Sequence, residues 1–173
     1  LHLSIRRQRQ MCIRDSAQYL LGQLYRDGPL LIPDSQKAKD WFTQAAEHGL
    51  PEAQYALGKL FLSADMEVRD PDEGIRWLKQ AAESGSHFAA YRLGKEYLTG
   101  EVVAKDTIEA VEWFSQSAEA GNQYVQYMLG KLYLTGQGVT HDQTRAMAWF
   151  SRSAAQGEPV RPALFGATKR PPS

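Results

Sequence analysis

Apolar side chains recur along the chain with the period of an α-helix. Ala53, Leu57 and Leu60 fall at positions i, i+4 and i+7, which places them on one face of a helix. Tyr55 and Leu62, seven residues apart, form a second apolar stripe on another side of the same helix. A helix that is apolar on two sides is packed between neighbours, as in a stack of helix pairs. The pattern therefore predicts an all-α fold of stacked helices.

A second helix is predicted to begin after Asp70, a residue type that favours the N-cap position. Pro71 suits the first helical position, and Glu73 stands where a capping box places a glutamate. The buried stripe of this helix is predicted to consist of Ile75, Leu78, Ala81 and Ala82. Gly85 then ends the helix as a left-handed residue. In the fourth copy of this pattern Arg145 replaces the glutamate, so we expect that helix start to be the least well capped.

The helix-turn-helix unit occurs four times, with a period of 36 residues and no insertion. Four of the columns that mark the phase are Tyr19, Tyr55, Tyr91 and Tyr127; Gly22, Gly58, Gly94 and Gly130; Trp41, Trp77, Trp113 and Trp149; and Asp34, Asp70, Asp106 and Asp142. The predicted repeats are residues 17–52, 53–88, 89–124 and 125–160. Glycine inside a helix costs roughly 1 kcal/mol relative to alanine, so the glycine column indicates a place where two helices approach closely.

The repeated motif resembles that of the Sel1-like repeat family, a relative of the tetratricopeptide repeat. It is clearest in residues 127–139, which read Tyr-Met-Leu-Gly-Lys-Leu-Tyr-Leu-Thr-Gly-Gln-Gly-Val. The resemblance covers residues 17–160, although the first two repeats lack the Gly-x-Gly-Val loop. The period of 36 separates it from the tetratricopeptide unit of about 34 residues. The resemblance implies an α-solenoid that binds other proteins as an adaptor or scaffold, without chemistry of its own.

The two ends of the chain depart from the repeat. Residues 11–16, Met-Cys-Ile-Arg-Asp-Ser, back-translate to the mosaic-end adapter of sequencing libraries, so we predict that residues 1–16 are a non-native, disordered segment. The alternative is a natural basic arm, because this segment carries four arginines and one aspartate. Residues 161–173 are predicted to be a degenerate start of a fifth repeat, with Phe165 and Gly166 in phase, followed by a disordered tail.

Charge is unevenly distributed along the chain, although 20 basic and 20 acidic side chains give a formal net charge of zero. The two ends are basic, which leaves the array of residues 17–160 with a charge of −6. An acidic array disfavours nucleic acid as a partner. The tyrosine and tryptophan columns are in phase with the apolar stripes, which predicts core packing rather than a stacking platform for single strands. We therefore expect the partner to be another protein or a peptide segment.

The sequence carries no enzyme signature. The four histidines include no pair at i, i+4, and the single cysteine, Cys12, lies in the segment predicted to be non-native. We predict no catalytic residue, no metal and no cofactor. No apolar stretch is long enough to span a membrane. We expect a cytoplasmic location and leave open an export signal upstream of Leu1. The alternative function is a C-terminal docking or regulatory region of a larger bacterial enzyme, such as a mobilisation relaxase.

Two groups of polar residues occupy positions that the fold does not explain. Lys59, Lys95 and Lys131 follow the glycine column in three successive repeats and are expected to form a ladder on one face, suited to an acidic or extended peptide. The alternative for this ladder is a solvated surface. Arg92 and Glu96 replace core residues at a spacing that allows pairing. They either open a groove or lie at the edge of the stripe and reach solvent. We predict that these five residues contact the partner on the concave face.

Overall fold

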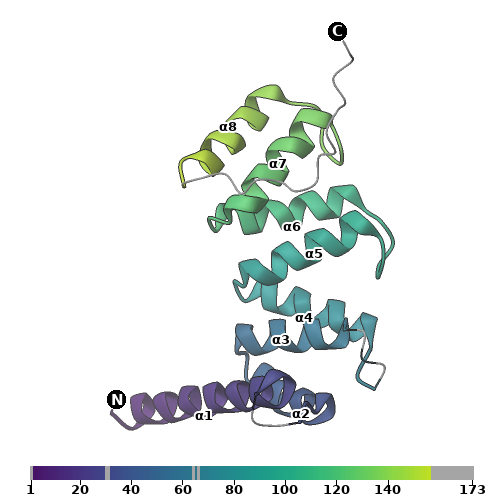
Figure 1. The fold of residues 1–173 in the computed structure, drawn as a ribbon. Coiled ribbons are helices and arrows are strands. Elements are labelled where there is room, and N and C mark those ends of the chain that lie inside the picture. Colours follow the sequence, from purple (N-terminus) through teal and green to yellow (C-terminus); the bar gives the residue numbers. More distant parts are fainter. Residues whose placement is uncertain (1, 30–31, 64, 66, 157–173) are drawn as a thin grey trace.

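The computed structural model describes residues 2–29, 32–63, 65 and 67–156, and these residues form a stack of α-helices (Figure 1). The helices are α1 (His2–Asp27), α2 (Ser35–Glu47), α3 (Pro51–Phe61), α4 (Pro71–Glu83), α5 (His87–Thr99), α6 (Thr107–Glu119), α7 (Gln123–Thr135) and α8 (Gln143–Ala154). Each helix packs chiefly against its neighbours in sequence. Since the described residues contain no strand, the predicted all-α solenoid of helix pairs is confirmed.

Helix α1 is longer than the other first helices because it begins at His2. Residues 2–16, for which we expected disorder, are helical and continue without a break into the first repeat. The segment contains no glycine or proline, so a helix held by the repeat can propagate back through it. The expectation of disorder is therefore corrected here. The adapter origin of the segment stays a prediction, and residues 161–173 lie outside the described part of the chain.

The glycine column sets the distance between the two helices of each repeat. A Cβ atom added to Gly94 in α5 would lie 2.6 Å from the Phe114 ring of α6. The same contact joins Gly22 to Phe42, Gly58 to Leu78 and Gly130 to Phe150. The side chain of the second helix thus fills the space that a Cβ would need, in a core packed without spare volume. The predicted close approach of the helices is confirmed.

Aspartate caps the second helix of every repeat. The carboxylate of Asp142 accepts a hydrogen bond from the backbone N–H of Arg145 at 2.9 Å, as that of Asp70 does from Glu73 at 3.2 Å. The backbone N–H of Asp142 donates to the carbonyl oxygen of Tyr133, at the end of the first helix, at 3.0 Å. The N-cap N–H is bonded in the same way in all four repeats, including those that carry the glutamate, so no repeat needs the second bond of a capping box. The prediction that α8 has the weakest cap is therefore wrong.

A glutamine side chain ties each pair of adjacent repeats together. In α7, Gln126 donates from Nε2 to the carbonyl oxygen of Ala118 at 2.9 Å, and Gln54 makes the equivalent bond in α3. Helix α5 has Ala90 at this position, and there Gln116 of α6 donates instead to the end of α4, at 2.7 Å. The last carbonyl groups of a helix have no partner within it, so these bonds stabilise the junctions between repeats.

Replacing Gly94 with alanine should lower the free energy of unfolding by about 1–2 kcal/mol. The added methyl group meets the buried Phe114 ring, and overpacking of this kind costs up to about 3 kcal/mol, of which the helix preference of alanine offsets roughly 1 kcal/mol. Urea denaturation of the whole chain measures the change. Lys95→Ala, on the exposed side of the same helix, is the matched control and should change stability by less than about 0.5 kcal/mol. Equal stability of Gly94→Ala and the parent chain would contradict the role given to the glycine column.

Candidate functional site

The first helices of repeats two to four present a row of aromatic and polar side chains on the side turned away from the core. We call this surface the odd-helix face. It consists of Glu52, Tyr55 and Lys59 of α3, Phe88, Tyr91, Arg92 and Lys95 of α5, and Tyr124, Tyr127 and Lys131 of α7. Each of these residues is at least partly exposed, whereas Ala53 and Leu57 on the other side of α3 are fully buried.

The three predicted lysines lie on the odd-helix face, one on each helix. Lys59 and Lys95 are exposed, and Lys131 is partly buried. The Nζ atom of Lys59 lies 5.4 Å from the centroid of the Tyr55 ring, one turn earlier on α3, which is a cation–π contact. Each lysine is thus presented from the same position of its helix. Their role in binding stays a prediction.

Arg92 and Glu96 form an ion pair on α5, with the Nε atom 2.7 Å from the carboxylate Oε1. The Nε atom has no hydrogen-bond partner of good geometry, so the contact is electrostatic rather than directed. The Glu96 side chain is only 5% exposed and that of Arg92 is 31% exposed. The carboxylate therefore lies inside the stack, where Leu60 and Leu132 stand in the adjacent repeats, and the guanidinium group covers it from the odd-helix face.

The tyrosine column, which we predicted to be core, lies half-buried at the odd-helix face. Tyr55 and Tyr91 pack against the core and remain partly exposed. Their rings also contact neighbouring repeats, since Tyr55 lies 6.1 Å from Phe88 and Tyr91 lies 5.9 Å from Tyr124 between centroids. The sequence holds a signal for this face, because Phe88, Tyr91 and Lys95 form a stripe at i, i+3 and i+7 that is separate from the core stripe.

A cavity of about 550 Å³ opens on this face between α1, α3 and the turn before α5. Three aromatic rings line it, from Tyr19, Tyr55 and Phe88, together with Glu52 and His87. Its volume lies within the range of ligand-binding cavities, and its aromatic lining suits an apolar side chain.

Basic side chains surround Tyr55 at this cavity. Burial raises the pKa of the Tyr55 phenol, and the positive charges of Arg92 and Arg26 oppose that rise. Burial likewise raises the pKa of Tyr91. These phenols are therefore neutral at physiological pH. The charge of this part of the surface comes from the cations beside them, with Lys59 over the Tyr55 ring.

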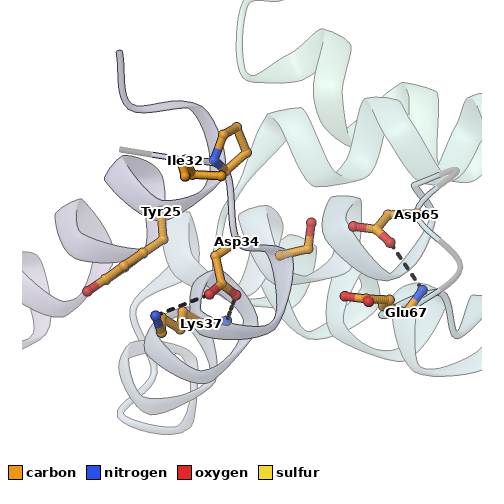
Figure 2. A pocket seen from close by; sticks show the side chains of 8 residues that line it. Tyr25, Ile32, Asp34, Lys37, Asp65 and Glu67 are labelled. Atoms are coloured by element: carbon orange, nitrogen blue, oxygen red, sulfur yellow. Dashed lines mark hydrogen bonds and ion pairs between the residues drawn. The ribbon is translucent and has the colours of Figure 1, made fainter. Parts of the chain in front are cut away.

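A larger cavity, of about 710 Å³, lies between the loops of the first two repeats (Figure 2). Its carboxylates are held by neighbouring groups. The backbone N–H of Lys37 donates to Asp34 at 2.9 Å and lowers the pKa of that carboxyl. The pKa of Asp65 is lowered first by the Ser35 hydroxyl and then by the backbone N–H of Glu67. Nowhere in the described ranges do three histidine, cysteine, aspartate or glutamate side chains gather as they would around a metal ion.

The model of the Sel1 repeat family matches four consecutive segments of the chain, at residues 15–50, 51–86, 87–122 and 123–158. The chain belongs to the Sel1 repeat family. The last three matched segments begin where α3, α5 and α7 begin, two residues before the repeats defined by sequence phase. The resemblance noted in the sequence is thus confirmed.

Solved structures show the same fold. A protective antigen of uropathogenic Escherichia coli is 34% identical with a TM-score of 0.75, and the match covers 82% of this chain and 30% of that one. A Sel1 repeat protein from Oxalobacter formigenes is 33% identical with a TM-score of 0.73, and the match covers 83% and 59%. This chain therefore spans less than two thirds of either protein. Cysteine-rich protein B of Helicobacter pylori shares the fold alone. It is 22% identical with a TM-score of 0.56, and the match covers 76% of this chain and 94% of that one.

A search of curated protein sequences found no match. Sel1 repeat arrays commonly act as scaffolds that bind other proteins, and the solenoid is typically non-catalytic. Among the described residues, no helix is both long enough and apolar enough to cross a membrane. These findings assign the class of the protein but not its partner.

Replacing Arg92 with alanine should lower the free energy of unfolding by about 1–3 kcal/mol, because Glu96 then keeps a buried charge without its partner. The double variant Arg92→Ala, Glu96→Leu copies Ala56 and Leu60 of the preceding repeat and should be at least as stable as the parent chain, since buried pairs are often replaced without loss. Urea denaturation compares the two variants. An equal loss in both would show that the ion pair itself stabilises the array.

Alkaline pH should weaken the fold through the tyrosines of the odd-helix face. The folded-state pKa of Tyr55 and Tyr91 is raised from 10.0, so the unfolded chain ionises first, and the free energy of unfolding falls as the pH rises through and above that value. Urea midpoints measured from pH 8 to 11 test this for the parent chain and the double variant Tyr55→Phe, Tyr91→Phe. The variant should lose less stability over this interval, and parallel curves would contradict the assignment.

Proposed function

We propose that this chain is a protein-interaction scaffold whose odd-helix face, on the concave side of the solenoid, binds a segment of a partner protein. The observation that carries the proposal is the row of aromatic and cationic side chains, each at least partly exposed, that recurs on three successive first helices. A solenoid of stacked repeats offers an extended surface of this kind, along which a peptide contacts several repeats in turn.

The residues predicted from sequence take distinct roles in this proposal. Lys59, Lys95 and Lys131 each offer an ammonium group to the partner from the same helical position. Arg92 offers its guanidinium group at the surface, and the buried Glu96 holds that group in place without itself contacting the partner. Exposed charges of this type chiefly set the rate and selectivity of encounter, so binding should weaken as salt is added.

The alternative function uses the same surface. If the array is the docking or regulatory region of a larger bacterial enzyme, the odd-helix face is still the surface that receives the partner segment. A cytoplasmic location belongs to the same proposal. Neither alternative assigns a catalytic residue to this chain.

Reversing the charge of the lysine ladder should abolish capture of the partner. The triple variant Lys59→Glu, Lys95→Glu, Lys131→Glu is compared with Lys39→Glu, Lys105→Glu, Arg152→Glu, which changes the net charge equally at positions off the odd-helix face. Proteins retained from a bacterial extract by the immobilised chain are identified by mass spectrometry. Proteins captured by the parent chain should be lost with the first variant and kept with the second. Unchanged capture by the first variant would refute the assignment of the face.

A further inference from the structure

We propose that the odd-helix face recognises an acidic peptide through one apolar anchor, an aromatic or proline side chain that enters the cavity between Tyr19, Tyr55 and Phe88. Carboxylates on either side of the anchor pair with Lys59, Arg92 and Lys95. This inference rests on the function proposed above and names the chemistry of the partner.

The cavity supplies the anchor site. Phe88 is 55% exposed, although a large apolar ring gains free energy from burial. Its ring lies 6.1 Å from that of Tyr55 and 4.1 Å from that of His87, so the exposed ring is held in place by its neighbours. In the second repeat the position equivalent to Phe88 is occupied by Glu52. The exposed ring of Phe88 is therefore a feature of the third repeat and not of every repeat. Aromatic-lined sites of this kind receive apolar anchors in peptide recognition.

Charge complementarity selects the acidic peptide. The residues that define the odd-helix face include four cations and one carboxylate, Glu52. The buried Glu96 offsets the charge of Arg92, so the three lysines supply the excess of positive charge over Glu52. The guanidinium group of Arg92 has several N–H donors and is 31% exposed, so donors remain for a peptide carboxylate. The array as a whole carries −6, so the local cations of this face suit a short acidic segment better than a long phosphate backbone.

A buried acceptor on α3, the helix that supplies Tyr55 to the cavity, adds a second observation. Gln54 is 1% exposed, and its Oε1 atom has no hydrogen-bond partner. In the fourth repeat the equivalent atom, Oε1 of Gln126, accepts a hydrogen bond from Gln156 at 3.0 Å. Repeat equivalence places Ser84 where Gln156 stands, and Ser84 lines the cavity. A serine is too short to make the same bond, so a donor from the peptide backbone completes it.

The first step of the test selects peptides of about 12 residues from a displayed random library on the whole immobilised chain. Fluorescence anisotropy then measures how tightly the chain binds the selected peptides. We expect the selected peptides to combine several aspartates or glutamates with one aromatic residue or proline. Phe88→Glu copies Glu52 of the second repeat, and Ser84→Gln copies Gln156 of the fourth, so both substitutions use residues that the fold accepts. Each should weaken binding by about tenfold or more, as loss of a central anchor does. Ile108→Glu, exposed on α6, is the control and should bind as the parent chain does.

The outcomes separate this inference from the proposed function. Selected peptides that are basic, or that lack an anchor, overturn the inference and leave the interaction face in place. Full binding by the Phe88→Glu and Ser84→Gln variants, with circular dichroism that matches that of the parent chain, also overturns the inference and leaves the interaction face in place. Tighter binding of a labelled thymidine oligonucleotide than of any selected peptide overturns it in favour of nucleic acid. Absence of any selected peptide, or binding that survives the lysine charge reversal, overturns the proposed function as well.

Discussion

In each repeat the second helix presses a side chain onto the glycine of the first helix, as Phe114 does onto Gly94. The rest of the repeat depends on this approach, because it fixes which sides of the first helix are covered. Core residues such as Leu93 then lie fully inside. Tyr91 and Lys95 lie on the remaining side, where both are at least partly exposed. The same contact that stabilises the fold therefore creates the surface that we assign to binding.

The sequence predicts those features of the fold that repeat within a short stretch of chain. The aspartate caps and the glycine contacts follow from residue type and period alone, since each depends on neighbours within one unit. The capping box failed as a prediction because its second bond is replaced by one to Tyr133, across the loop. The helical state of residues 2–16 lies outside the repeat pattern, because it depends on local helix preference and on the repeat that continues the helix.

The candidate site was only partly predictable for a different reason. Periodicity identifies an apolar stripe but does not say which of two stripes a neighbouring helix covers. For this reason it predicts a core position for Tyr55, which lies half-buried in the lining of the cavity. The division of the Arg92 and Glu96 pair, with one charge inside and one at the surface, depends on packing across repeats. The net charge of −6 for residues 17–160 is a sum over the whole array, so it does not reveal that cations gather on the odd-helix face.

Each helix packs chiefly against the next one along the chain, so the contacts of this fold are mostly local in sequence. Arrays of this kind fold rapidly and open one unit at a time from their ends, since no distant segment closes the structure. A peptide that contacts α1, α3 and α5 together supplies the missing long-range connection. Its occupancy would then make the first three repeats open as one cooperative block, and amide hydrogen exchange in those helices would slow together on binding.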